Sequence, residues 1–137
     1  YLLNTRNAPT AESLMRSRFS AYVLKNFAYI LNTYAEKQRS KLSINELKQS
    51  ADGTHWLSLQ VVDYSTKVDS AQVEFKAFYR VENQFFVMHE LSDFIQVDNQ
   101  WFYTTGTMLP NSGEIKPERN TPCLCASGKK FKKCCGK

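Results

Sequence analysis

The first 122 of the 137 residues contain no cysteine, and the chain has two histidines, His55 and His89. The main part of the sequence therefore offers no disulfide framework and no cluster of histidine and cysteine metal ligands. No apolar run approaches the ~20 residues of a membrane-spanning helix, and no signal-peptide pattern is present. From these absences we expect a soluble cytoplasmic protein without a membrane span.

Common catalytic patterns are missing as well: the sequence has no nucleophile elbow, no phosphate-binding loop and no paired-carboxylate signature. The length and a hydrophobic content of 42% allow one compact domain with a small appendage and exclude a second large domain. Residues 1–113 also lack net charge, with eleven basic and eleven acidic residues. The whole net charge of +5 lies in residues 114–137, which carry seven basic and two acidic residues.

All four cysteines lie in the last fifteen residues, at Cys123, Cys125, Cys134 and Cys135. A C-x-C pair, a loop of eight residues and an adjacent Cys-Cys pair supply four soft ligands that can close around one tetrahedral ion, and Zn²⁺ is the usual one. Gly128 can adopt the positive φ that turns the loop back on itself. The spacing thus predicts a closed structural zinc site.

The loop between the cysteine pairs is basic and carries Lys129, Lys130, Phe131, Lys132 and Lys133. Ammonium groups near thiols favour the thiolate, the form that binds metal, and four thiolates with one Zn²⁺ leave this tail at about +3. Such a basic surface can contact a protein, RNA, the ribosome or anionic lipid, and charge alone does not choose among them. Equally, the lysines can simply offset the thiolates and keep the tail soluble.

Other uses of the four cysteines stay open at this point. Two disulfides are possible, although adjacent cysteines fit a shared metal better than two bridges. A redox-active pair is a third possibility, because lysine-rich surroundings produce reactive thiolates, but the spacing is not the C-x-x-C of thioredoxin-like sites.

The run from Cys123 to Gly136, Cys-x-Cys-x-Ser-Gly-Lys-Lys-Phe-Lys-Lys-Cys-Cys-Gly, resembles the SEC-C motif. This zinc-binding motif forms the tail of the SecA translocation motor and occurs on many otherwise unrelated bacterial proteins. The resemblance implies Zn²⁺ bound by the four cysteines. It also implies a docking role, since the similar SecA tail binds the chaperone SecB.

Upstream of this tail, the sequence predicts helices first. Apolar residues recur at helical spacing over residues 11–34, with Thr10 as N-cap, which predicts a long amphipathic helix with a break near Asn26. Residues 36–41 are predicted as a charged connection and residues 43–48 as a short helix.

The period then changes from helical to twofold, which is typical of strands. Turn signals fall at Glu82-Asn83 and Asp98-Asn99, and in the second strand Val73, Phe75 and Ala77 share one face while the other face is largely polar and open to water. The pattern predicts an antiparallel meander of four strands, at residues 56–62, 71–81, 84–97 and 100–105.

Helices followed by a curved antiparallel sheet indicate an α+β fold. This order resembles the cone of nuclear transport factor 2 and ketosteroid isomerase, in which the sheet wraps a long N-terminal helix. The runs 8–23 and 73–80, with Met88-His89-Glu90 and Trp101-x-Tyr103, are similar to the YchJ-like family of bacterial proteins. That resemblance implies a nuclear transport factor 2-like cone and zinc binding but no reaction; it also implies a first cysteine cluster before Tyr1, which this sequence does not contain.

A cavity in the cone would offer a second class of function. His89 and Glu90 are neighbours in one strand, so their side chains cannot both enter one cavity without a bulge, and His89 reads as a hydrogen-bonded core residue. Arg16 and Arg18 lie about 200° apart around the helix axis, so both cannot face the same way. The candidate cavity residues are Arg16, Tyr79, His89, Glu90 and Tyr103.

Together these patterns predict a cone domain over residues 1–110, a linker over 111–122 and a SEC-C zinc knuckle over 123–137. We expect a zinc-binding interaction or adaptor module whose basic knuckle docks on a protein or ribonucleoprotein. The alternative is a small-molecule-binding protein, or an enzyme of the isomerase or dehydratase type, that uses the cone; this alternative rests on analogy between folds.

Overall fold

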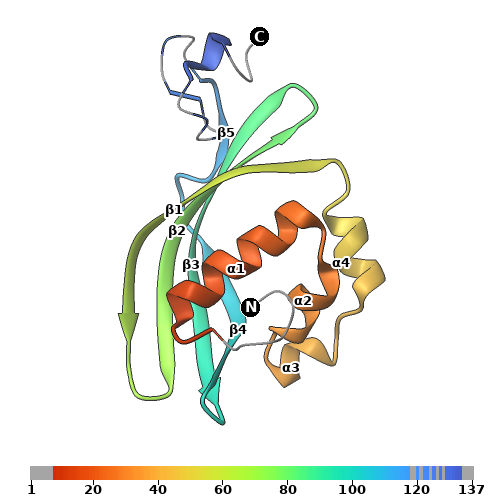
Figure 1. The fold of residues 1–137 in the computed structure, drawn as a ribbon, viewed down its shortest axis with the longest axis vertical. Coiled ribbons are helices and arrows are strands. Elements are labelled where there is room, and N and C mark those ends of the chain that lie inside the picture. Colours follow the sequence, from red (N-terminus) through yellow and green to blue (C-terminus); the bar gives the residue numbers. More distant parts are fainter. Residues whose placement is uncertain are drawn as a thin grey trace.

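A curved antiparallel sheet carries four helices on its concave side in the computed structural model of the protein (Figure 1). The structure describes residues 8–117, 120, 122, 123, 125, 127 and 129–133. Its helices are α1 (Ala11–Leu24), α2 (Phe27–Asn32), α3 (Glu36–Arg39) and α4 (Ile44–Ser50), and its strands are β1 (Thr54–Thr66), β2 (Ser70–Val81), β3 (Gln84–Val97), β4 (Gln100–Met108) and β5 (Gly113–Ile115). A 3-10 turn, η1 (Phe131–Lys133), follows in the tail.

The predicted long helix is indeed broken near Asn26. A capping box starts α1: the Thr10 hydroxyl accepts from the Ser13 amide, and the Ser13 hydroxyl accepts from the Thr10 amide, both at 3.0 Å. At the other end Lys25 adopts the left-handed conformation with φ 60°, and the Asn26 side chain then caps α2. The break turns α2 away from α1 and packs the two helices against each other.

One helix is absent from the prediction. Residues 36–41 were expected to form a charged connection, but α3 occupies most of them. Ala35 starts this helix without a side-chain cap, and none of its residues is buried, so neither a capping signal nor an apolar stripe marks it in the sequence. The short helix α4, by contrast, begins after Ser43, whose hydroxyl accepts from the Glu46 amide.

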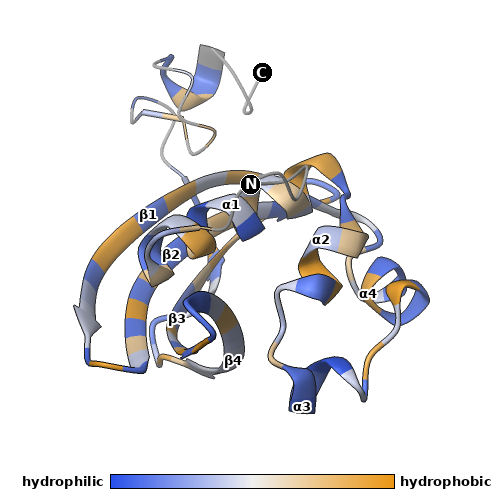
Figure 2. Ribbon diagram, turned by 60° about the horizontal axis from the view of Figure 1, so that its bottom comes forward, coloured by the Kyte–Doolittle hydropathy of each residue, from blue (hydrophilic) through white to orange (hydrophobic). Residues whose placement is uncertain are grey.

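The strands form the predicted meander, in the order β1-β2-β3-β4. β1 is longer than predicted and carries two register shifts, between Trp56 and Ser58 and between Val61 and Asp63. Bulges of this kind bend a strand and increase its twist. The sheet therefore curves around the helices, as Figure 2 shows, and forms the concave surface of an α+β cone.

The final strand was also not predicted. β5 lies inside residues 111–122, the predicted linker, and pairs with β3 through Phe85 and Ile115. β4 pairs with the neighbouring part of β3, so β5 continues β4 along the same edge after a short excursion at residues 109–112. Part of the predicted linker is therefore part of the sheet.

The core lies between the concave face of the sheet and α1 and α2. Val73, Phe75 and Ala77 on β2 are buried, as their alternation predicts. On the opposite face of β2, Gln72 is exposed and the side chains from Glu74 to Arg80 are half-buried, so this face is only partly open to water. In the described part of the chain, no helix is both long and apolar enough to cross a membrane.

Candidate functional site

A cavity of about 280 Å³ lies between α1 and the concave face of the sheet. It opens beside the end of α4, where the exposed residue Ser50 forms part of its wall. Its remaining walls come from α1, from Tyr34 and from the first four strands. Most of the lining is aromatic or aliphatic, and the charged side chains in it are Arg18 and Glu90.

Arg18 is 3% exposed and enters the cavity from α1. Its Nη1 donates to the Ile30 carbonyl oxygen at 2.9 Å and to Thr33 Oγ1 at 2.6 Å. The Ile30 carbonyl belongs to the last turn of α2, where carbonyl groups lack helical partners and attract a cation. The guanidinium carbon also lies 4.5 Å from the centre of the Tyr34 ring and 4.6 Å from that of Tyr103.

Glu90 enters the same cavity from β3. Its Oε2 accepts hydrogen bonds from the hydroxyls of Ser92 and Tyr103, the second at 3.1 Å. Gly106 on β4 leaves the space for this arrangement: a Cβ at that position would lie 2.3 Å from Glu90 Cδ and Oε2 and 2.7 Å from the Tyr103 hydroxyl oxygen. The glycine is thus part of the site because it has no side chain.

Two tyrosines of the cavity keep their protons far into the alkaline range. Burial raises the pKa of Tyr103 far above its ordinary value, and the Glu90 carboxylate raises it further. Burial also raises the pKa of Tyr22 to about 12, against an opposing effect of Arg18. Both hydroxyls are consequently hydrogen-bond donors at physiological pH.

Trp56 adds a further donor to the wall. Its indole Nε1 is buried and has no hydrogen-bond partner among the described residues. Its ring packs against Phe19, Tyr22 and Tyr79, with centroid distances of 6.0, 5.9 and 5.0 Å. A buried donor without an acceptor is unfavourable, so this N–H is a group that a bound molecule could satisfy.

Of the five candidate cavity residues, Glu90 and Tyr103 line the cavity. Arg16 does not line it, because its exposed side chain pairs with that of Glu12, with 3.4 Å between Nη2 and Oε1. Arg18 lines the cavity instead. The sequence contained the signal, because Arg18 lies four residues from both Leu14 and Tyr22 on the apolar stripe of the helix. Tyr79 also lies outside the lining, and its ring stacks on Phe86 at 5.1 Å.

His89, the fifth candidate, points to the opposite face of β3 from Glu90, as the alternation of strand residues requires. It is buried, with Nε2 2.7 Å from Glu74 Oε2 and Nδ1 beside Asn111 Oδ1. The Ser112 hydroxyl accepts from its backbone amide and donates to its carbonyl. His89 is therefore a hydrogen-bonded structural residue that holds the excursion between β4 and β5 against the sheet.

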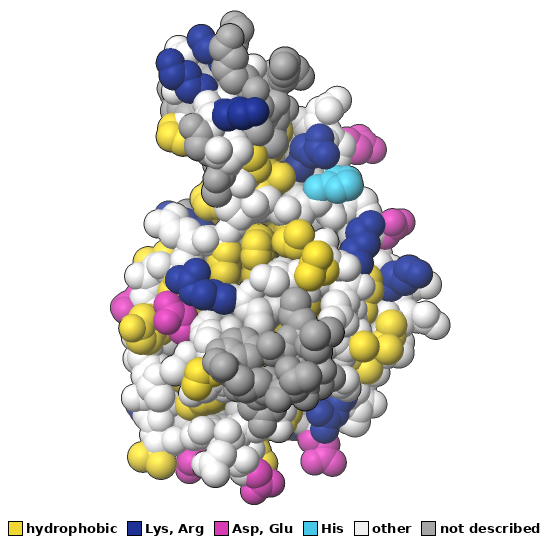
Figure 3. Space-filling view, viewed as in Figure 1, with side chains coloured by type: hydrophobic (Ala, Val, Ile, Leu, Met, Phe, Trp, Pro, Cys, Tyr) yellow, Lys and Arg dark blue, Asp and Glu magenta, His cyan; other side chains and the backbone are white. Residues whose placement is uncertain are grey.

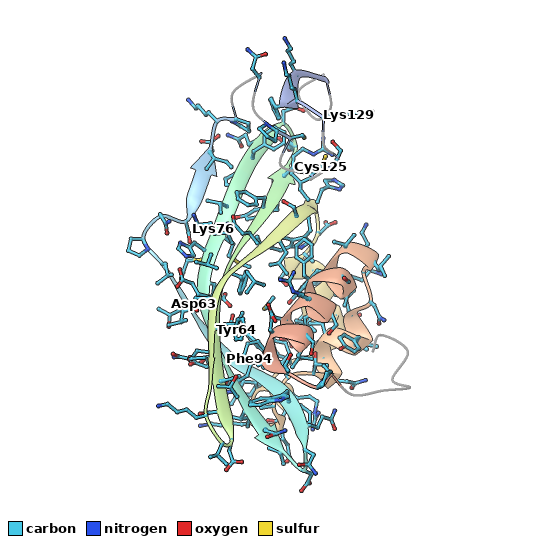
Figure 4. All side chains as sticks on the ribbon, turned by 60° about the vertical axis from the view of Figure 1, so that its left-hand side comes forward. Asp63, Tyr64, Lys76, Phe94, Cys125 and Lys129 are labelled. Atoms are coloured by element: carbon cyan, nitrogen blue, oxygen red, sulfur yellow. The ribbon has the colours of Figure 1, made fainter. Side chains whose placement is uncertain are left out.

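The cysteine-rich tail lies at one end of the sheet, beyond β5 (Figure 1). Cys123 is 5% exposed and Cys125 is half-buried, whereas Cys134 and Cys135 lie outside the described residues. The amide of Cys123 donates to the Lys129 carbonyl at 2.8 Å, and an antiparallel bridge joins Pro122 to Lys130. The chain thus folds back between these positions; Figure 4 labels Cys125 and Lys129 in this turn.

The predicted partner-binding residues of the tail differ in exposure. Lys129 and Lys130 are exposed and Lys132 is half-buried; the side chain of Lys133 lies outside the described set. Figure 3 shows the lysines gathered on the tail above the cone. Phe131 is half-buried, and its ring packs edge-on against Phe85 of β3, with centroids 5.1 Å apart, so it contacts the cone.

Comparison with known proteins identifies the family to which this architecture belongs. The family described as "YchJ, middle NTF2-like domain" matches residues 10–106, and the SEC-C motif matches residues 119–137. This chain belongs to the YchJ family. The similarity to nuclear transport factor 2 that the helix-sheet order predicts is thereby confirmed for the fold.

Relatives of this YchJ-family chain match it over most of its length. A UPF0225 protein of Actinobacillus succinogenes is 42% identical over 130 residues, which cover 93% of this chain and 80% of the relative. A UPF0225 protein of Vibrio cholerae is 39% identical over 138 residues, covering 98% and 87%.

Two solved structures are similar as well. The solution structure of a SEC-C motif containing protein from Rhodopseudomonas palustris has a TM-score of 0.76 and 32% identity, covering 79% of this chain and 85% of that one. The crystal structure of a SEC-C motif containing protein from Psychrobacter arcticus has a TM-score of 0.69 and 37% identity, covering 98% and 78%.

Proposed function

We propose that this protein is a zinc-binding interaction module whose basic knuckle docks on an acidic partner protein. The observation that supports the proposal most directly is the turn of the tail, in which the amide of Cys123 donates to the carbonyl of Lys129. The match to the SEC-C motif over residues 119–137 supports our assignment of Cys134 and Cys135 as the other two ligands. Four thiolates of this kind suit Zn²⁺ in a closed structural site.

The partner surface we propose is the exposed lysine side of the tail. Because the Phe131 ring is in contact with Phe85, it anchors the knuckle to the cone and leaves Lys129 and Lys130 facing solvent. Exposed lysines give long-range attraction toward an acidic surface and a binding rate that falls with salt. The cone is then the carrier that presents the knuckle.

The zinc part is tested by measuring metal per chain by mass spectrometry under reducing conditions. We expect one zinc in the wild type and none in the double variant Cys134→Ser, Cys135→Ser, with the cone still folded by circular dichroism. A metal-free wild type with four titratable thiols would refute the structural zinc site and turn attention to the redox chemistry of the thiols.

The docking part is tested by capturing proteins from a bacterial lysate with wild-type protein and with Lys129→Glu, Lys130→Glu. The matched control reverses two exposed lysines of the cone, Lys37→Glu and Lys41→Glu. We expect the wild type and the control variant to capture acidic proteins, also after ribonuclease treatment, and the tail variant to capture none. Capture abolished by ribonuclease would indicate a ribonucleoprotein partner instead, and equal capture by both variants would contradict docking through these lysines.

The cone cavity favours a second function, the binding of a small molecule. The buried Arg18 side chain and the unpartnered Trp56 indole N–H border the same space, and each gains from a polar ligand. Ligand binding should change Trp56 fluorescence, with a Trp56→Phe variant identifying the contribution of Trp101. No change with any anionic, cationic or neutral ring compound would argue against this function.

A further inference from the structure

Two opposite charges face the cone cavity without contacting each other. Arg18 and Glu90 both line it, yet no ion pair joins them among the residues that the structure describes. Opposite charges in a small and largely apolar space gain by pairing, because an uncompensated buried charge is expensive. Here neutral groups hold each charge in its own place, which keeps the space between them available.

Each of the two charged groups also keeps part of its hydrogen-bonding capacity. Within the described structure, both hydrogen bonds of Arg18 use Nη1, so Nε and Nη2 remain as donors. Both hydrogen bonds of Glu90 end on Oε2, so Oε1 remains as an acceptor. The cavity thus offers cationic donors on the α1 side and an anionic acceptor on the β3 side.

The space between these groups is aromatic. Its walls include the rings of six residues, and a volume of about 280 Å³ admits a single ring with a short polar chain. Aromatic faces attract both a flat ring and an ammonium group. The aromatic lining residues are Phe19, Tyr22, Tyr34, Trp56, Phe75 and Tyr103.

We propose that the cavity binds a free aromatic amino acid as a zwitterion, with the ligand carboxylate on Arg18 and the ligand ammonium on Glu90. A ligand with only a carboxylate would be attracted by Arg18 but repelled by the Glu90 carboxylate. A ligand with only an ammonium group would be attracted by Glu90 but repelled by Arg18. A ligand with both charges compensates both residues at once. This inference rests on the second proposed function, small-molecule binding in the cone.

The experiment measures binding to the full chain by titration calorimetry with four probes of similar size. L-phenylalanine carries both charges, 3-phenylpropanoate only the carboxylate, phenethylamine only the ammonium, and benzyl alcohol neither. We expect L-phenylalanine to bind at least tenfold more tightly than the other three, because it alone forms both charged contacts.

Matched variants assign the two contacts. Arg18→Met and Glu90→Gln should each weaken L-phenylalanine binding tenfold or more, whereas Arg16→Met on the outer side of α1 and Glu74→Gln on the outer face of the sheet should leave it unchanged. Glu90→Gln should at the same time reduce the preference for L-phenylalanine over 3-phenylpropanoate. Should Arg18→Met fail to fold, Glu90→Gln and the probe series still decide.

The outcomes separate this inference from the function on which it rests. Binding of benzyl alcohol or 3-phenylpropanoate as tight as that of L-phenylalanine would overturn the zwitterion proposal while small-molecule binding stands. No binding of any probe would overturn the proposal directly, and the fluorescence screen with other ring compounds would then decide whether the cavity binds small molecules at all.

Discussion

A single buried arginine determines what the cavity can contain. Arg18 lies on the stripe of α1 that faces the core, where the neighbouring residues are apolar. Its charge is compensated by a helix-end carbonyl, a hydroxyl and two tyrosine rings. Deleting such a group leaves Thr33 Oγ1 without this donor and the Ile30 carbonyl with the Thr33 hydroxyl alone, which generally costs more than the contact contributes. At the residue scale, the polar character of the site depends on a few positions in an otherwise apolar core.

Gly106 is one of these positions, and Gly106→Ala should destabilise the protein by about 1–3 kcal/mol. The new Cβ would lie 2.3 Å from the Glu90 carboxyl group, so the Glu90 side chain must move away from Ser92 and Tyr103. Urea unfolding measures the loss. In a Glu90→Ala background the same glycine substitution should cost much less, and an equal cost in both backgrounds would contradict this steric explanation.

The raised pKa of Tyr22 predicts that the protein loses stability at alkaline pH. Burial raises its folded-state pKa to about 12, whereas the unfolded chain has the ordinary value near 10. Between these values the unfolded state releases the proton first, so stability is complete below about pH 10 and falls by roughly 2–3 kcal/mol as pH rises through 12. Tyr103, whose pKa is raised further, adds its own slope in this range, so Tyr22→Phe should make the curve of unfolding free energy against pH less steep without removing its slope. Tyr64→Phe, at an exposed position, should leave the curve unchanged. Identical slopes in the wild type and Tyr22→Phe would contradict the assignment.

The sequence-based prediction included Glu90 and Tyr103 as cavity residues and missed Arg18. The apolar spacing of α1 places Arg18 on the side that faces the core, but Arg16 was assigned to the cavity in its place. The role of Gly106 depends on a neighbour in another strand, and the unpartnered Trp56 N–H depends on the whole surrounding core. Such properties arise from tertiary contacts and leave no local pattern.

At the scale of elements, long periodic segments and the short, capped helix α4 were predictable, whereas two very short elements without such signals were not. The break near Asn26, the four-strand meander and both two-residue turns follow from capping residues, alternation and turn residues. α3 and β5 have four and three residues, too few for a period to show. β5 forms because Phe85 on β3 provides a paired edge for Ile115, which is again a tertiary effect.

The break between α1 and α2 carries a stabilising prediction. Lys25 has φ 60°, and the amides of Lys25 and Asn26 donate to the Tyr22 and Ala21 carbonyls in the manner of a Schellman motif. Glycine adopts this conformation without the steric penalty of a Cβ, so Lys25→Gly should stabilise the protein by about 0.5–1 kcal/mol. The same substitution inside α4, Lys48→Gly, should destabilise it by about 1 kcal/mol. Thermal unfolding of both variants measures the contrast, and a loss of stability in Lys25→Gly would refute the argument.

At the scale of the whole molecule, the tail and the cone are joined by an aromatic contact as well as by the chain. Phe131 lies in η1, close to the proposed zinc ligands, and Phe85 lies in β3 where β5 pairs with it. Aromatic pairs of this geometry contribute about 0.5–1.5 kcal/mol beyond the area they bury. We expect a contact of this size to help orient the knuckle and its loss to leave the cone folded.

We therefore expect Phe131→Ala to separate the knuckle from the sheet while both parts stay folded. Hydrogen exchange at Phe85 and Ile115 should become faster, because the edge of β3 and β5 loses its cover, while exchange in the core around Val73 should not change. The proposed zinc content should stay at one per chain, since the phenylalanine is not a ligand. Tyr64→Ala, at an exposed position on β1, is the control and should change neither quantity.

Two outcomes would contradict this expectation. Loss of zinc in Phe131→Ala would mean that the ring holds the metal loop itself together. Unchanged exchange at Phe85 would mean that the backbone near β5 fixes the knuckle without the ring.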